Sequence, residues 1–98
     1  MQMYDLNWTD DEDTSGDWYV ALEDGKVVGG CIVDRKNNGE VWLYDLVVLP
    51  SKRRQGIGRR LVSRVLKDHP EIHLSSTTEG LPFYRRLIEE GKNIVLHE

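Results

Sequence analysis

The sequence predicts a mixed α/β fold, in which one sheet packs against two helices. Two turn dipeptides, Asp24-Gly25 and Asn38-Gly39, separate apolar stretches in the first half, and such dipeptides are typical of antiparallel hairpins. In the second half helical periodicity alternates with short apolar stretches, and a strand, helix, strand order implies a right-handed crossover between parallel strands. With 98 residues the chain has room for one hydrophobic core, so we expect a single domain over residues 1–98.

The first half reads as an antiparallel meander. Weak alternation, or a longer apolar run, predicts strands over Met3–Trp8, Trp18–Leu22, Lys26–Val33 and Val41–Leu49. The polar residues Thr9–Gly16 predict a loop between the first two strands. Gly29-Gly30 inside the third strand indicates a bulge or a close backbone approach. Pro50 ends the fourth strand because it cannot donate to a sheet ladder.

The second half predicts two helices and two short strands. A helix is expected from Ile57 to Lys67, since its apolar residues recur at the 3.6-residue period of one helix face, and Pro70 breaks it. A strand over Ile72–Ser75 follows. A second helix is expected between the capping residues Thr77–Gly80 and the stop at Gly91. Asn93–Leu96 can form a last strand.

The loop Ser51–Gly58, between the fourth strand and the first helix, carries two glycines and three cations. The first N–H groups of a helix have no intrahelical partner and lie at the positive end of its dipole, so such a loop can bind an anion. The spacing matches neither G-x-x-x-x-G-K-[ST] nor G-x-G-x-x-G. On these residues alone, a phosphate site and a solvated basic helix start are both open.

Composition narrows the function classes. The chain is 39% apolar and 31% charged with a net charge of −4, which is ordinary for a soluble protein, and no apolar run is long enough to span a bilayer. The lone Cys31 fits a reducing cytoplasm, and the histidines show no metal-ligand spacing. Residues 1–24 hold eight acids and no Lys or Arg, whereas residues 52–67 hold seven bases and no acid. The basic region favours an anionic ligand, and the acidic one could favour a cationic ligand.

Two motifs resemble those of the GNAT family of N-acetyltransferases. Arg53-Arg54-Gln55-Gly56-Ile57-Gly58 is similar to the family motif [RQ]-x-x-G-x-[GA], and it follows an apolar strand as it does there. Thr77–Leu87 resembles the signature N-x-x-A-x-x-F-Y-x-[KR]-L, with Thr77 in place of Asn and Gly80 in place of Ala. The resemblance implies a three-layer GNAT-like sandwich without the family's N-terminal helices, with acetyl-CoA as cosubstrate. It covers roughly Trp18 to the C-terminus.

The resemblance also implies which residues hold acetyl-CoA. The pantetheine arm would lie along the backbone of Leu46, Val47 and Val48. The pyrophosphate would be wrapped by the following loop and helix start, which comprise Arg53, Arg54, Gln55, Gly56, Ile57, Gly58 and Arg59. Thr77 is a further cofactor-binding candidate, and Tyr84 corresponds to the tyrosine often assigned as general acid to the leaving thiolate.

The general base is open at this point. Family members often use a Glu on the fourth strand, but the best-matching positions hold Trp42 and Tyr44. Asp45 matches a common family aspartate and is a candidate catalytic residue, although strict alternation would turn it to the other face. Glu40, His73 and a water chain are alternatives. Cys31 in an apolar strand is more typical of core than of a nucleophile.

Without the covering helices the acceptor site should be open, which suits a protein lysine, a peptide terminus or a polyamine. The leading hypothesis is direct attack of the amine on acetyl-CoA in a ternary complex. A non-catalytic coenzyme A-binding regulatory module is the second, supported by the missing base. Nucleic-acid binding through the basic helix is disfavoured by the overall acidity. A free strand edge at the C-terminus could be completed by a second chain in a homodimer.

Overall fold

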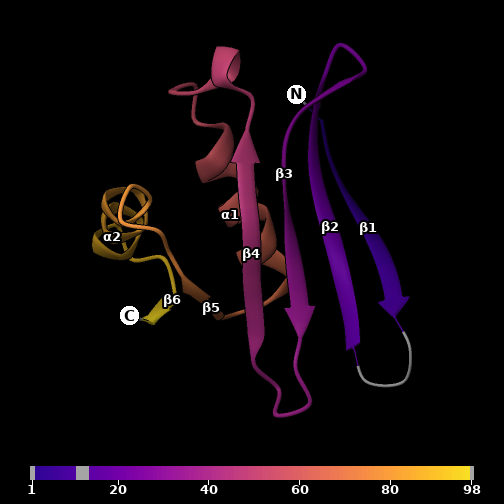
Figure 1. Ribbon diagram of the computed structural model, residues 1–98, viewed down its shortest axis with the longest axis vertical. Helices are drawn as coiled ribbons and strands as arrows, with labels where there is room; N and C mark the ends of the chain where they lie inside the picture. The colour runs from indigo at the N-terminus through magenta and orange to yellow at the C-terminus, as the bar shows by residue number, and fades with distance from the viewer. Residues whose placement is uncertain (1, 11–13, 98) are drawn as a thin grey trace.

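The computed structural model describes residues 2–10 and 14–97, which form a six-stranded sheet and two α-helices (Figure 1). The strands lie in the order β1-β2-β3-β4-β5-β6. They are β1 Gln2–Asp10, β2 Thr14–Glu23, β3 Lys26–Arg35, β4 Val41–Val48, β5 Ile72–Ser75 and β6 Ile94–His97. The helices are α1 Ile57–Asp68 and α2 Leu81–Glu89, and a 3₁₀ turn spans Pro50–Lys52. The mixed α/β class is therefore confirmed.

The prediction of a loop over Thr9–Gly16 is largely wrong. β1 runs to Asp10 and β2 resumes at Thr14, and these two residues pair in an antiparallel hairpin. Backbone pairing in a hairpin needs no apolar side chains, so polar composition alone did not identify the loop. Residues 11–13 of the acidic stretch lie outside the described residues. Within the described part of the chain, no helix is long and apolar enough to cross a membrane.

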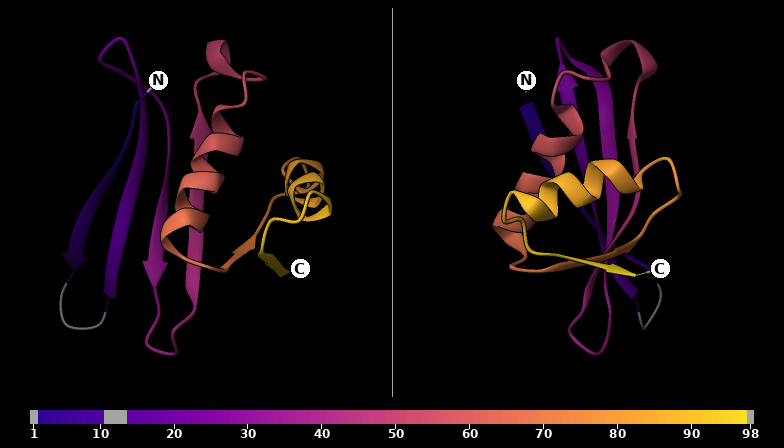
Figure 2. Two further views of the ribbon diagram at one scale, coloured as in Figure 1. Left: turned by 180° about the vertical axis from the view of Figure 1, so that it is seen from behind. Right: turned by 90° about the vertical axis from the view of Figure 1, so that its left-hand side faces the viewer.

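Both helices cover the same face of the sheet. β5 pairs in parallel with β4, and β6 pairs in parallel with β5 on its far side, so the sheet grows in the same direction at both connections. Because such crossovers are right-handed, α1 and α2 lie on one side of the sheet. The two helices also meet, since a Cβ on Gly58 of α1 would lie 3.3 Å from the Phe83 ring of α2. Figure 2 shows α1 against the long strands and α2 beside it. The described residues thus form two of the three layers of the predicted sandwich.

The core lies between the helices and the sheet. α1 buries Leu61, Val62 and Val65 completely, as its periodicity predicts, and α2 buries Leu87. The strands contribute alternate residues such as Tyr19 and Leu43. The opposite face is open: Trp18 is 48% exposed and Tyr44 is 38% exposed.

Two bulges shape the middle of the sheet. The β2–β3 register shifts beside Gly29, which confirms the expected irregularity; a Cβ there would lie 3.0 Å from the Val47 carbonyl oxygen. In β4, Gly30 pairs with Val47 but Ile32 pairs with Tyr44, so β4 carries one extra residue at this point. Asp45 lies in this bulge with φ of 51°. The expectation that strict alternation turns Asp45 away from the face of Tyr44 is therefore wrong, because the bulge interrupts the alternation.

β4 is paired fully on one side and barely on the other. Its pairing with β3 extends from Val41 to Val48, whereas Trp42 and His73 form the single β4–β5 pair among the described residues. β5 then diverges from β4 (Figure 1). The second half of β4 consequently presents an unpaired backbone edge, and this edge borders the candidate site.

Candidate functional site

A cavity of about 860 Å³ lies in the wedge between the second half of β4 and the two helices. It extends from the strand to the loop that precedes α1 and to the start of α2. Its lining residues are Leu46, Val47, Val48, Lys52, Arg53, Arg54, Gly56, Ile57, Gly58, Arg59, Glu79, Gly80, Phe83, Tyr84 and Arg86. The cavity is apolar along the strand and cationic along the loop.

The loop aims the start of α1 at this cavity. Arg54 and Gly56 both adopt positive φ, 65° and 80°, and Gly56 is the N-cap of α1. No side chain caps the helix, so its first N–H groups remain available to a ligand. A 12-residue helix with an uncapped N-terminus, surrounded by arginine and lysine, is well suited to hold phosphate groups.

The strand wall offers backbone groups over an apolar floor. Leu46 and Val48 pack against the core, and Val47 between them points outward. The Arg53 Nε donates a hydrogen bond of 3.2 Å to the Val48 carbonyl oxygen, which shows that this edge accepts donors from outside the sheet. An extended ligand with amide groups can therefore pair with β4 in the place that β5 leaves free.

The α2 wall holds Tyr84. Its ring is 8% exposed and packs in the core, while the residue also lines the cavity. Burial, with a smaller contribution from Cys31, raises the pKa of Tyr84 to about 12. The phenol keeps its proton at neutral pH, and burial makes it a weaker acid than an exposed tyrosine. Burial likewise raises the pKa of Cys31 to about 12, which favours the core interpretation of that thiol over a nucleophile.

Two ion pairs orient cations at the cavity rim. Lys52 Nζ lies 2.8 Å from Glu23 Oε1, and Arg59 forms an ion pair with Glu90 at the end of α2. These contacts lower the pKa of Glu23 and of Glu90, mainly through the hydrogen bonds from the cations. The rim pairs connect the loop and α1 to β2 and α2, and so hold basic groups beside the cavity.

Most of the predicted cofactor residues meet at this cavity. Gln55 and Thr77 are exceptions: both are exposed, and the Thr77 hydroxyl oxygen accepts a 3.3 Å hydrogen bond from the Gly80 N–H before α2. The prediction did not include five lining residues, namely Lys52, Glu79, Gly80, Phe83 and Arg86. Helical spacing could have found two of them, because Phe83 and Arg86 lie three residues apart on one side of α2.

A second, smaller pocket lies on the open face and holds Asp45. Its volume is about 360 Å³, and its walls are apolar side chains that include Trp18, Ile32 and Leu49. The Asp45 carboxylate is the one acidic group that lines it among the described residues. Val47 lines both pockets, so the two cavities adjoin at β4.

Comparisons with known proteins agree with this geometry. A family model described as an acetyltransferase (GNAT) domain matches residues 14–87. A crystal structure of a Trypanosoma brucei acetyltransferase is similar at a TM-score of 0.58 and 24% identity, over 76% of this chain and 61% of that one. A Bacillus anthracis acetyltransferase solved in complex with acetyl coenzyme A is similar at a TM-score of 0.50 and 18% identity, over 91% and 40%. No curated protein matches the sequence. The chain therefore spans less than two thirds of the length of these solved structures.

Proposed function

Because the chain belongs to the GNAT acetyltransferase family, we propose that it transfers the acetyl group of acetyl-CoA to a primary amine of an exposed acceptor. The observation that carries this proposal is the cavity in the β4–β5 wedge, which joins a free strand edge to an uncapped, cationic helix start. The family uses acetyl-CoA, and the residues present here fit it.

The fit follows the chemistry of the ligand from end to end. Phosphates need N–H donors and cations, which the start of α1 and the Arg53–Arg59 region supply. The pantetheine arm carries amides, which match the unpaired backbone of Leu46 to Val48. Gly58 lets the start of α1 approach α2 closely beside the cavity, since a Cβ there would lie 3.3 Å from the Phe83 ring.

The reaction needs one proton donor and one proton acceptor. An amine attacks the thioester carbonyl carbon in a ternary complex, the C–N bond forms, and the C–S bond breaks. The leaving thiolate takes a proton from Tyr84, which the buried phenol retains at neutral pH. The proposed role of Asp45, whose carboxylate lines the adjoining pocket, is to attract the ammonium group before that group loses its proton.

The acceptor is proposed to be a protein lysine, a peptide terminus or a polyamine. The face that holds Asp45, Trp18 and Tyr44 is open, so a side chain or a flexible chain can reach it without entering an enclosed site. The pocket combines apolar walls with a single carboxylate, which suits an amine on an aliphatic stem.

A second candidate is a module that binds coenzyme A without catalysis. Trp42 and Tyr44 occupy the strand positions where the resemblance suggests a carboxylate base, and this observation favours the second candidate. Both candidates predict ligand binding, and only the first predicts turnover.

The experiment has two stages. Saturating acetyl-CoA should stabilise the protein by a few kcal/mol in a thermal unfolding assay, as expected for about 10²- to 10³-fold excess over Kd. Thiol release is then measured with a lysine peptide and spermidine as acceptors. No stabilisation by acetyl-CoA or coenzyme A would reject both candidates, and binding without release for any amine would favour the second.

A further inference from the structure

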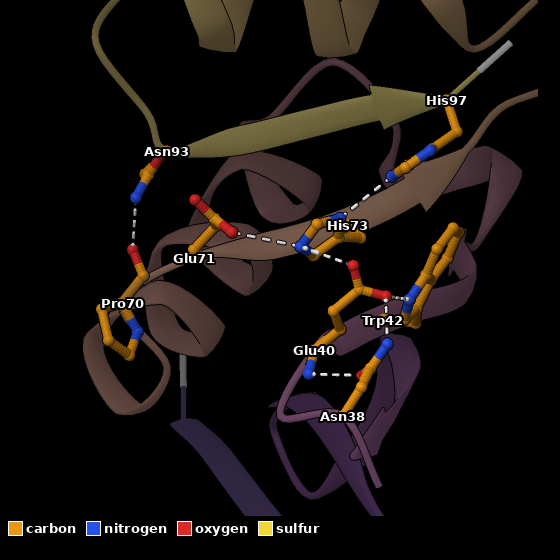
Figure 3. A network of polar contacts seen from close by, with 8 residues as sticks. All are labelled: Asn38, Glu40, Trp42, Pro70, Glu71, His73, Asn93 and His97. Carbon is orange, nitrogen blue, oxygen red and sulfur yellow. Dashed lines mark hydrogen bonds and ion pairs between the residues drawn. The ribbon is translucent and has the colours of Figure 1, made fainter. Parts of the chain in front are cut away.

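A cluster of titratable side chains lies on the open face where β4 and β5 touch, and the mechanism above does not use it. His73 of β5 is 8% exposed and lies among Trp42, Glu40, Glu71 and His97 (Figure 3). The groups that face it come from four parts of the chain: the turn before β4, β4 itself, the residue before β5, and β6.

The contacts fix the tautomer of both imidazoles. His73 Nε2 lies 3.1 Å from Glu71 Oε1, and a carboxylate only accepts, so this nitrogen carries a proton. In a neutral His73 the Nδ1 is then an acceptor, and it lies 2.9 Å from His97 Nε2, which must donate. This hydrogen-bonded series of Glu71, His73 and His97 therefore ends at the Nδ1 of His97, which carries no proton in the neutral pair.

Acidic and aromatic groups surround this pair. Glu40 Oε2 lies 3.7 Å from His73 Nε2, and Glu40 is held by Asn38 at 3.0 Å and by the Trp42 indole N–H at 3.3 Å. Those hydrogen bonds keep the pKa of Glu40 below its usual value, so its charge persists. Both imidazoles also stack on the Trp42 indole, with ring centroids 4.6 and 5.5 Å away, where a cation is attracted by the ring face.

The position relates the pair to the proposed transfer. The single β4–β5 pair, Trp42 with His73, is the point from which the wedge opens, and the cavity that would hold the thioester begins on the same strand at Leu46. The imidazoles lie on the face from which the acceptor approaches. Tyr84 belongs to the helix-covered core, so the imidazoles and the proposed donor lie on opposite faces of the sheet.

We propose that His73 and His97, backed by Glu71 and Glu40, form the proton acceptor of the acetyl transfer; this inference rests on the proposed function. The ammonium N–H bond breaks and its proton goes to the unprotonated imidazole nitrogen, which frees the nitrogen lone pair to attack the thioester carbon. The proton then passes to solvent after the product leaves.

The test is the pH dependence of kcat/KM for thiol release, in wild type and in His97→Gln and His73→Gln. In wild type, kcat/KM should decrease as the pH falls, with the slope that protonation of a single group produces. In each variant, kcat/KM at neutral pH should be about 10²-fold lower than in wild type, and its decrease on the acid side should disappear. The Kd of acetyl-CoA should be unchanged within about twofold. His69→Asn is the control, because His69 is the one histidine of the chain that lies outside the cluster. This variant should keep the decrease of kcat/KM on the acid side. Imidazole in solution should restore part of the rate of His97→Ala.

Two outcomes separate this inference from the proposed function. Thiol release that keeps its rate and its decrease on the acid side in both glutamine variants would overturn the pair and leave the transferase proposal standing. No release from wild type with any amine would overturn both. If His73→Gln does not fold, the test uses His97→Ala, in which imidazole in solution should restore part of the rate of thiol release.

Discussion

The two faces of the sheet carry similar residues in different surroundings. On the helix-covered face Tyr19, Ala21 and Leu43 are almost fully buried, and their partners are leucines and valines of α1. On the open face Trp18 and Tyr44 remain exposed and Asp45 lines a shallow apolar pocket, while His73 is covered only by the rings of Trp42 and His97 among the described residues. The covered face provides stability, and the open face provides access.

β4 connects these two roles. Its inward residues, such as Leu43, belong to the core, while its second edge is left unpaired beyond Trp42. The bulge at Asp45 and the shift at Gly30 allow the strand to stay attached to β3 while it departs from β5. A strand buried on one face can thus offer backbone groups to a ligand at its edge without loss of the core, because the two functions use different atoms.

The largest expected effect distinguishes the faces by stability. Leu61→Ala removes a fully buried side chain of α1 and should lower the free energy of unfolding by about 2–5 kcal/mol. Leu49→Ala makes the same change on the open face, where the leucine is 45% exposed, and should cost less than about 1 kcal/mol. Urea unfolding of both variants measures the difference, and equal costs would show that the open face is covered in solution.

The covered face was the predictable part of the molecule. The apolar periodicity of α1 predicted its start at Ile57 correctly and its end one residue too early, at Lys67 instead of Asp68. The two turn dipeptides marked where β2 and β3 end and where β3 and β4 begin. Such signals are local, since a helix face or a hairpin is defined within a few residues. The motif resemblance then predicted several residues that line the cavity, such as Arg53, Gly56 and Tyr84, because the motifs have fixed places relative to these elements.

The open face was not predictable to the same degree. The Asp45 bulge depends on how β4 leaves β5, which no local pattern encodes. The contact between His73 and His97 depends on the register of two short parallel strands, in which His73 pairs with Val95. Both strands were predicted, but a register shift of one residue would have turned either histidine to the other face.

Tyr84→Phe tests whether the covered face contributes a catalytic group to the cavity. Loss of the phenol should reduce kcat by about 10²-fold, since a positioned general acid contributes at least that much, and should leave the Kd of acetyl-CoA unchanged. Tyr19→Phe is the matched control: it removes the 2.8 Å hydrogen bond to Asp68 on the same face, away from the cavity, and should affect stability alone. An unchanged kcat in Tyr84→Phe would remove this tyrosine from the mechanism.

Arg54→Gly tests the cationic end of the cavity. The change removes one charge and relieves the positive φ of Arg54, so the fold should be retained while the Kd of acetyl-CoA rises about tenfold, or about 1.4 kcal/mol. Arg60→Ala removes the same charge from a residue of α1 that does not line the cavity, and should change Kd by less than about threefold. Titration calorimetry at two salt concentrations measures both, and equal losses would indicate a general charge effect rather than a phosphate site.

The smallest expected effect is an alkaline loss of stability from the covered face. Burial raises the pKa of Cys31 from 9.0 to about 12, so above pH 9 the folded protein binds a proton that the unfolded chain has lost. Stability is therefore fully present below pH 9 and falls as the pH rises toward 12, by about 1 kcal/mol at pH 10. Tyr84 adds to the loss above pH 10, because its pKa is raised in the same direction. Urea unfolding at pH 8 and pH 10 should show this decrease in wild type and a smaller one in Cys31→Ala. An equal decrease in both proteins would mean that the thiol is reached by solvent, and the covered face would then be less closed than its packing indicates.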